Sequence, residues 1–268
     1  MRIFSVLFCW LFASSVIFSQ SSGNQQVVSG IVLQNNNATL DGGKLLNSLR
    51  SSWKIKTDSV NISDKTIVFN SGLATVMIAQ LNYPADPVEI KTAAKLSWMW
   101  PSADEETSGN KSQIVVSVIG PSRSTLDLHM LFTKVSAAIL EITQSSAVYM
   151  SSRYLLVSKG FFSAAARNMT DNKTIPLYCW VYFGNPGNGG AFTFGMQEFG
   201  KPNLEIVQSN MSSSEIHSVI YDAALTIIKY NAGPDKEQAL TTEEGSKLII
   251  KPAKGVLLEG EDVWQLQF

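Results

Sequence analysis

The hydrophobic pattern of the chain switches repeatedly between the two-residue period of strands and the 3.6-residue period of helices. Residues 27–34, 66–70, 73–81 and 112–119 are rich in β-branched and apolar side chains, which is typical of strands. A Ser-Gly dipeptide separates the second run from the third and predicts a tight hairpin. The nearly uninterrupted apolar run 112–119 predicts a strand that is buried on both faces.

Helices are predicted where a capping residue precedes an apolar face. Asp41 is placed to cap a helix at about 42–51, and Asp86 with Pro87 begins a second helix that Pro101 should end. The longest helix is predicted at 126–142, where apolar side chains recur every three or four residues. Ser212 and Glu215 have the spacing of a capping box and predict a helix after them.

The second half of the chain repeats this mixture of elements. Short strands are predicted at 147–150, 247–251, 256–258 and 263–268, an aromatic strand at 177–183, and a short helix at 161–168. The pattern predicts an α+β domain over residues 27–268, with a mixed, largely antiparallel sheet and helices mainly on one face. The spacing is compatible with two ferredoxin-like halves, near 27–120 and 145–268.

The N-terminus has the layout of a secretory signal peptide. Arg2 precedes an apolar stretch that is shorter than the ~20 residues of a membrane-spanning helix, and small polar residues follow it. We expect residues 1–20 to be a signal peptide cleaved near Ser19 or Gln20, and residues 21–26 to be a disordered mature N-terminus. The alternative is a retained anchor. A bacterial protein exported to the periplasm or the medium, without an integral membrane span after cleavage, is therefore expected.

Charge and cysteine content limit the classes of function. The formal net charge is −1, so the chain has no basic excess with which to hold nucleic acid. Of its two cysteines, Cys9 lies in the apolar N-terminal run, so an intrachain disulfide is not expected after cleavage. Cys179 stands among aromatic residues, which favours a buried small apolar side chain over a reactive thiolate.

Motifs of established enzyme classes are missing from the sequence. It contains no HExxH, CxxC, GxSxG or phosphate-binding glycine motif, so we predict neither a metal site nor a cofactor. The weak catalytic candidates are His129, His217, Glu198 and Glu205. For the histidines a place at the edge of the core is the competing interpretation, and for the glutamates an outward position on a strand.

Aromatic side chains supply the candidates for binding. Trp98 and Trp100 follow the second predicted helix, and tryptophan is a favoured anchor at protein interfaces. Two residues that are two positions apart on a helix do not share a face. One ring is therefore expected to enter the core, while the other covers its rim.

The most patterned stretch, residues 194–206 (FGMQEFGKPNLEI), also carries a resemblance. Together with 98–101 (WMWP), 114–120 (IVVSVIG) and 178–183 (YCWVYF), it resembles the uncharacterised bacterial family called domain of unknown function 4261, over about residues 28–268. The resemblance implies no established activity. Physically, Gly195 and Gly200 are suited to positive φ or close backbone approach, and Pro202 fixes the entry to a strand.

Three functions remain open at this stage. The absence of a catalytic cluster and the surplus of aromatic residues favour a non-enzymatic module that binds a protein or another component of the cell envelope. The first alternative is a hydrolase or other enzyme with an unrecognised acidic and histidine site. The second is a toxin-neutralising or stress-related interaction protein.

Overall fold

The computed structural model describes residues 25–122, 125–233, 237–242, 244–245 and 247–268. The predicted signal peptide lies outside these residues. Gln25 and Gln26, which the sequence assigned to a disordered segment, begin the first strand.

The described elements are β1 (Gln25–Gln34), α1 (Gly42–Ser51), β2 (Asp58–Ile62), β3 (Thr66–Ser71), β4 (Ala74–Leu81), α2 (Pro87–Leu96), α3 (Ala103–Thr107), β5 (Ser112–Pro121), α4 (Thr125–Ile142), β6 (Ser145–Met150), η3 (Ser151–Arg153), β7 (Leu155–Ser158), α5 (Lys159–Asn172), η4 (Leu177–Cys179), β8 (Tyr182–Gly187), β9 (Gly190–Phe194), η5 (Met196–Phe199), β10 (Asn203–Ile206), α6 (Ser213–Lys229), β11 (Gln238–Thr241), β12 (Lys247–Lys254) and β13 (Asp262–Gln267).

The strands form two sheets, and the protein is of the α+β class with mostly antiparallel pairing, as predicted. The first sheet has the order β2-β3-β4-β5-β1-β6-β7. Within it, β1, α1, β4, β5, α4 and β6 follow one another in the ferredoxin-like manner, with the spatial order β6-β1-β5-β4 and every neighbouring pair antiparallel. β2 and β3 extend one edge of this unit, and β7 extends the other.

Helices cover both faces of the first sheet, but unequally. α1, α4 and α5 lie on the face to which Val32, Val118 and Val148 point, where they build the main core. α2 and α3 cover the β6–β7 end of the opposite face, where Leu33 and Tyr149 belong to a second, smaller core. The prediction of helices mainly on one face therefore describes this sheet well.

The second sheet, which has the order β11-β12-β13-β10-β9-β8, is built differently. β10 and β13 run parallel, while the other neighbours are antiparallel, and α6 packs on β8, β9 and β10. Residues 145–158, which the sequence grouped with the second half, form β6 and β7 of the first sheet. The border between the sheets thus lies between Ser158 and Tyr182.

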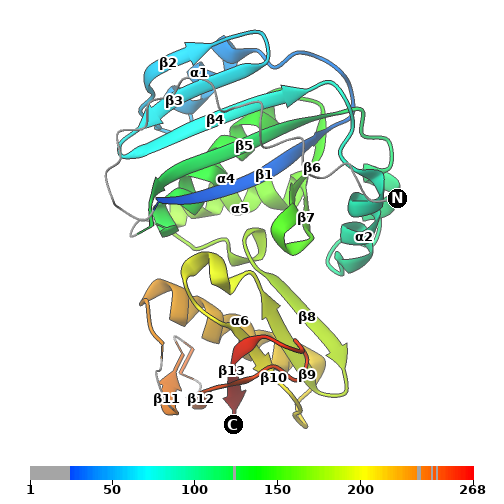
Figure 1. Cartoon of the computed structure of the whole chain (residues 1–268), viewed down its shortest axis with the longest axis vertical. Coiled ribbons are helices and arrows are strands. Elements are labelled where there is room, and N and C mark those ends of the chain that lie inside the picture. Colours follow the sequence, from blue (N-terminus) through cyan, green and yellow to red (C-terminus); the bar gives the residue numbers. More distant parts are fainter. Residues whose placement is uncertain (1–24, 123–124, 234–236, 243, 246) are drawn as a thin grey trace.

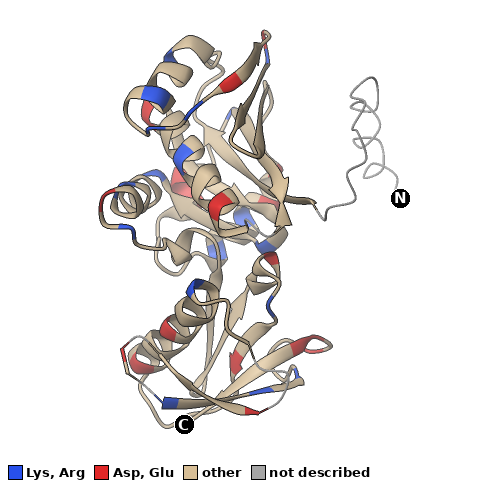
Figure 2. Cartoon of the chain, turned by 90° about the vertical axis from the view of Figure 1, so that its left-hand side faces the viewer, with Lys and Arg blue, Asp and Glu red and all other residues tan. Residues whose placement is uncertain are grey.

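The two sheets lie one above the other along the long axis of the molecule (Figure 1). A continuous apolar cluster joins them, because buried residues of both sheets and of the connecting segment belong to it. Trp180 of that segment is fully buried, and its Nε1–H donates to the Thr133 hydroxyl of α4 at 2.8 Å. Acidic and basic residues are interspersed over the side of the molecule that Figure 2 presents.

Two predicted strands are corrected. Residues 177–183 do not form one strand: the chain turns through η4, and β8 begins at Tyr182, because the Cys179 and Trp180 N–H groups bond to carbonyls three residues back. Residues 256–258 form a turn, whose N–H groups bond to the Glu205 carboxylate instead of a neighbouring strand. Among the described helices, none has the length and apolar character that a membrane span requires.

Candidate functional site

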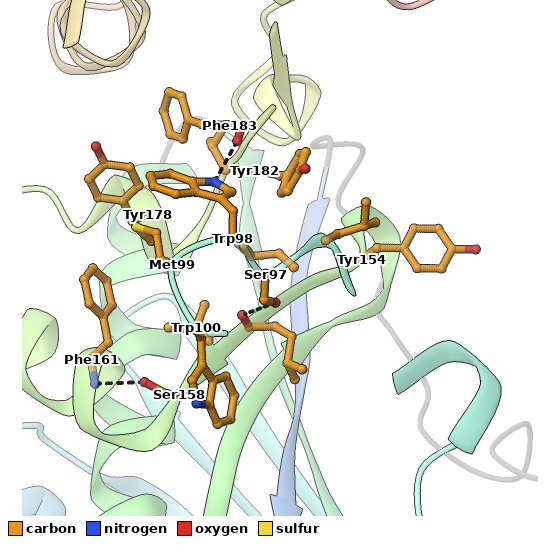
Figure 3. A pocket seen from close by; sticks show the side chains of 15 residues that line it. Ser97, Trp98, Met99, Trp100, Tyr154, Ser158, Phe161, Tyr178, Tyr182 and Phe183 are labelled. Carbon is orange, nitrogen blue, oxygen red and sulfur yellow. Dashed lines mark hydrogen bonds between the residues drawn. The ribbon is translucent and has the colours of Figure 1, made fainter. Parts of the chain in front are cut away.

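The segment between α2 and α3 presents its aromatic side chains at the place where the two sheets meet. α2 ends at Leu96, so Trp98 and Trp100 lie in a loop and not on a helix as the sequence suggested. Ser97 fixes the start of this loop, since its hydroxyl donates to the Leu156 carbonyl of β7 at 3.1 Å. The Trp98 Nε1–H donates to the Phe183 carbonyl of β8 at 3.0 Å (Figure 3). The loop therefore bridges the edge strands of both sheets.

The two tryptophans point in different directions, as Figure 3 shows. Trp98 is 53% exposed, and Met99 beside it is 42% exposed. Trp100 packs against the smaller core and donates to the Glu106 carboxylate at 3.0 Å. Hydrogen bonds from Ser102 and Trp100 lower the pKa of Glu106. One tryptophan ring packs at the core and the other lies at its rim, as expected. The two rings point apart because they belong to a loop, and not because of the period of a helix.

His217 of α6 lies in an aromatic cluster with Trp98. The two rings meet edge to face at 4.9 Å between centroids, and the His217 Nε2 is 2.8 Å from the Tyr178 hydroxyl. Tyr221 stacks on Tyr178 at 4.5 Å. Burial lowers the pKa of His217 and raises that of Tyr178, so both groups are neutral near pH 7. A neutral tyrosine–histidine hydrogen bond orients the rings.

Two hollows beside this cluster share Phe161 and Tyr178 in their linings, and we call them together the junction groove. Its narrow end is an apolar cleft of about 50 Å³, lined by Trp98, Met99, Phe161 and Tyr178 among others. Phe161 and Tyr178 also line the wide part, of about 740 Å³, which continues between α5 and α6 to Lys173 and Lys229. Tyr154, Phe161, Met99 and Trp98 are at least 40% exposed around the narrow end. Ligand sites are usually concave and lined mainly by apolar and aromatic side chains, with a few polar groups.

His129 of α4 lies away from the groove and is fully buried. Its ring stacks on Phe199 of η5 at 4.4 Å, and its Nδ1 is 2.9 Å from the Thr125 carbonyl, while its Nε2 has no hydrogen-bond partner. Burial lowers the pKa of His129 to about 3; the bond to Thr125 opposes this shift, and the Arg153 charge adds to it. The imidazole is neutral at physiological pH, and it packs the second sheet against the first.

Glu198 and Arg153 form an ion pair across the same junction. Arg153, at the end of η3, is buried, and its Nη1 is 3.3 Å from the Glu198 carboxylate. Burial lowers the pKa of Arg153, and the charge of Glu198 opposes that shift. Ser152 also donates to Glu198, at 3.4 Å. Glu198 therefore has a structural partner from the first sheet.

Glu205 occupies the centre of the second sheet and is fully buried, whereas the sequence favoured an outward position. Its carboxylate accepts the N–H groups of Val256, Leu257 and Leu258 at 3.0, 3.0 and 2.7 Å. Asn203, two residues earlier, accepts from the N–H groups of Gly195 and Met196 and donates to Glu261. Side chains of the conspicuous stretch 194–206 thus hold loops of the second sheet in place through hydrogen bonds.

The four catalytic candidates are distributed over separate places. His217 contacts Tyr178, which lines the junction groove, while His129 and Glu198 belong to the contact between η5 and the first sheet. Glu205 bonds to the 256–258 turn. Cys179 is fully buried, and burial raises the pKa of its thiol. In the ranges that the structure describes, no three His, Cys, Asp or Glu side chains are grouped as metal ligands.

No motif in the sequence marked several of the residues that line the groove. Met99, Tyr154, Phe161 and Tyr221 come from four different segments, and only their apolar character hinted at a role. Arg153 was also missed, because a single arginine after a short strand has no pattern that reveals burial.

Comparison with known proteins identifies one part of the chain. Residues 192–267 match the family model described as Domain of unknown function (DUF4261). The resemblance to this family is thereby confirmed for β9 to β13, which include the 194–206 stretch. Over the first sheet, the resemblance stays a prediction. Searches of curated proteins and of solved structures gave no match.

The DUF4261 match coincides with most of the second sheet and with α6. It includes Glu198, Asn203, Glu205 and His217, and it excludes Trp98, Phe161 and Tyr178. The junction groove combines Tyr221 and Leu225, which the match includes, with residues outside it.

Proposed function

We propose that this protein is a non-enzymatic module that binds a protein partner in the junction groove. The observation that carries the proposal is the gathering of exposed Trp98, Met99, Tyr154 and Phe161 around one cleft. Large apolar side chains that are exposed together at a concave place mark interaction sites more often than scattered ones do. Tryptophan and tyrosine are also the side chains that most often dominate the binding energy of interfaces.

The backbone of the narrow end supports the same function. Leu156 and Phe183 belong to the edge strands β7 and β8, and their carbonyls bond to side chains of the Ser97–Trp98 pair instead of a further strand. The exposed rings are therefore held by both sheets. Such prior order reduces the entropy that a binding surface loses when it meets a partner.

An enzyme built on Glu198, Glu205, His129 and His217 is less well supported. Catalytic groups must lie within hydrogen-bond reach of one reacting centre. Here, Glu205 is occupied by three backbone N–H groups and His129 lies inside the core.

The proposed place of action is the bacterial periplasm or the extracellular space, after removal of a signal peptide near Ser19 or Gln20. The support is the charge and apolar layout of the N-terminal residues. Mass spectrometry of the mature protein should find a new N-terminus close to these positions. An intact Met1 peptide would contradict export through cleavage.

Photo-crosslinking in the native host tests the binding function. A photoreactive amino acid placed at Met99 or Phe161 should give a covalent adduct with a protein, because both side chains are exposed in the groove. The matched control is Leu73, which is 73% exposed in the β3–β4 turn and does not line the groove. Adducts from Leu73 equal to those from Met99 and Phe161, or no adduct from the groove positions, would refute the proposal.

A further inference from the structure

One face of the first sheet carries an uncharged surface away from the junction groove. α1, α4 and α5 pack on one side of this sheet, and on the other side the described helices α2 and α3 cover the β6–β7 end. Figure 1 looks onto that second side, with α4 behind the strands. Strands β1, β5, β4 and β3 lie side by side there.

Three rows of four residues cross these strands, with one residue from each strand in every row. The rows are Val27–Ile119–Thr75–Asn70, Ser29–Ser117–Met77–Val68 and Ile31–Val115–Ala79–Thr66. We call these residues the open sheet face. All of them are exposed or half-buried, and none is charged. Depletion of charged residues distinguishes the centre of a protein interface from ordinary surface.

The polar side chains of the open sheet face already have partners within the chain. The Ser29 and Ser117 hydroxyls lie 3.0 Å apart, and the Thr75 hydroxyl donates to the Asn70 side-chain oxygen at 3.0 Å. The Thr66 hydroxyl is 2.6 Å from that of Ser63. Loss of water from this face would therefore leave none of these hydroxyls without a hydrogen bond, so an apolar neighbour can cover it at low cost.

The size of the open sheet face is sufficient for a dimer. Four strands are about 19 Å wide at a spacing of about 4.8 Å, and the eight residues of β4 are about 26 Å long. Each copy would thus bury about 500 Å², and two copies about 1,000 Å², which is the area that a specific interface needs. A second copy also brings no charge, so no ionised group would be buried without a partner.

The helices beside the face determine how two copies can meet. Stacking β1 on β1 would place the β6–β7 end of each copy, with α2 and α3 on it, over that of the other. The helices would then hold the sheets apart. A two-fold axis parallel to the strands instead places β1 of one copy over β3 of the other and leaves α2 beside the contact.

We propose that two copies of this protein pack through their open sheet faces about such an axis. The central rows then meet in opposite order, so that Ser29 lies close to Val68 of the partner copy and Ser117 lies close to its Met77. None of the residues of this face lines the junction groove, so the dimer and the proposed binding function are independent.

Sedimentation equilibrium of the purified protein tests the dimer. At micromolar concentration it should give twice the mass of one chain, and a single-chain mass up to millimolar concentration would overturn the proposal. Met77→Lys and Ser29→Lys should each weaken the dimer about a hundredfold or more, because each would bury a charge without a partner. Ser29 is exposed in the single chain, so its variant should keep the fold, which circular dichroism checks.

The matched control is Ile249→Lys, which introduces the same charge at a 40% exposed apolar position of β12 in the second sheet. This variant should remain a dimer. Dissociation of Ile249→Lys to the same extent, or dimers that persist in both variants of the open sheet face, would refute this face as the interface.

A mixture of two variants tests the arrangement of the copies. Ser29→Lys and Val68→Glu should each be monomeric alone. Mixed in equal amounts they should regain the mass of a dimer, because the two introduced charges then lie opposite each other and the second Ser29–Val68 contact is unchanged. A mixture that stays monomeric would overturn the placement of β1 over β3.

Discussion

At the residue scale, Glu205 of the conspicuous 194–206 stretch contributes to stability through the hydrogen bonds that its carboxylate accepts. Glu205 is a fully buried carboxylate that three backbone N–H groups stabilise. A buried charge is tolerated only with such partners. The sequence could not reveal this role, because the partners lie 51 to 53 positions further along the chain.

Replacing Glu205 by Gln should therefore destabilise the fold. One oxygen acceptor becomes an amide donor that faces N–H groups, and a buried charged hydrogen-bond set is lost. We expect the free energy of unfolding to fall by about 2–4 kcal/mol, measured by urea denaturation. Glu259→Gln, at an exposed position of the neighbouring turn, is the matched control and should change it by less than about 0.5 kcal/mol. Equal losses in the two variants would contradict the structural role.

His129 should make the protein sensitive to acid. Burial holds its pKa at about 3 in the folded state, against a normal value of 6.5, so the unfolded chain binds the proton more strongly. Its contribution to stability is fully present above about pH 6.5 and is lost as the pH falls toward 3, at about 1.4 kcal/mol per pH unit.

The variant His129→Phe isolates this effect, since it keeps a ring against Phe199 and removes the titrating group. Between pH 6.5 and pH 5, wild type should lose about 2 kcal/mol more than the variant, as measured by urea denaturation at both pH values. Parallel losses in the two proteins would show that His129 does not carry the difference.

At the element scale, local capping signals were reliable predictors of helices. Asp41 and Asp86 accept N–H groups in the first turns of α1 and α2, and Ser212 with Glu215 forms the predicted capping box of α6. The short strands β2, β7 and β11 were missed, and the 177–183 strand was wrong in part. Their conformation depends on pairing and packing with distant segments, which a local pattern does not contain.

For the two glycines that flank η5, within the DUF4261 match, the sequence indicated the backbone conformation but not the tertiary contacts. Gly195 and Gly200 both adopt positive φ, at 113° and 67°, which is one of the two roles that the sequence suggested for them. Their surroundings differ: a Cβ at Gly195 would lie 2.8 Å from the Arg153 Cδ, while nothing lies within 4 Å at Gly200. The contact with Arg153 could not be predicted, because it joins different sheets.

This difference predicts unequal effects of alanine. Gly200→Ala should cost only the backbone strain, about 1 kcal/mol. Gly195→Ala should cost more, about 2–4 kcal/mol, because it also displaces buried Arg153 from its ion pair with Glu198. Urea denaturation of both variants measures the difference. A cost at Gly200 equal to or larger than that at Gly195 would contradict the close approach.

At the scale of the whole molecule, the sequence predicted the fold class better than it predicted the residues of the candidate site. The α+β class follows from local periodicity and from the sequence of elements. The predicted halves differ from the structure, because the ferredoxin-like unit of the first sheet also needs α4 and β6, which lie beyond residue 120. The junction groove does not follow from local periodicity, since it unites Trp98, Phe161, Tyr178 and Tyr221 from four segments. Trp98 and Trp100 were the groove residues that the sequence analysis made candidates for binding.

The continuous core predicts that the two sheets unfold together. Trp180, fully buried between them, and the contact of Phe199 with His129 connect the second sheet to α4 of the first. Opening the junction would expose apolar surface of both sheets at about 25 cal/mol per Å². Urea unfolding followed by far-ultraviolet circular dichroism and by tryptophan fluorescence should therefore give one coincident transition. In Phe199→Ala the midpoint should fall while the two curves stay coincident; separate transitions in wild type would mean that each sheet is stable without the other.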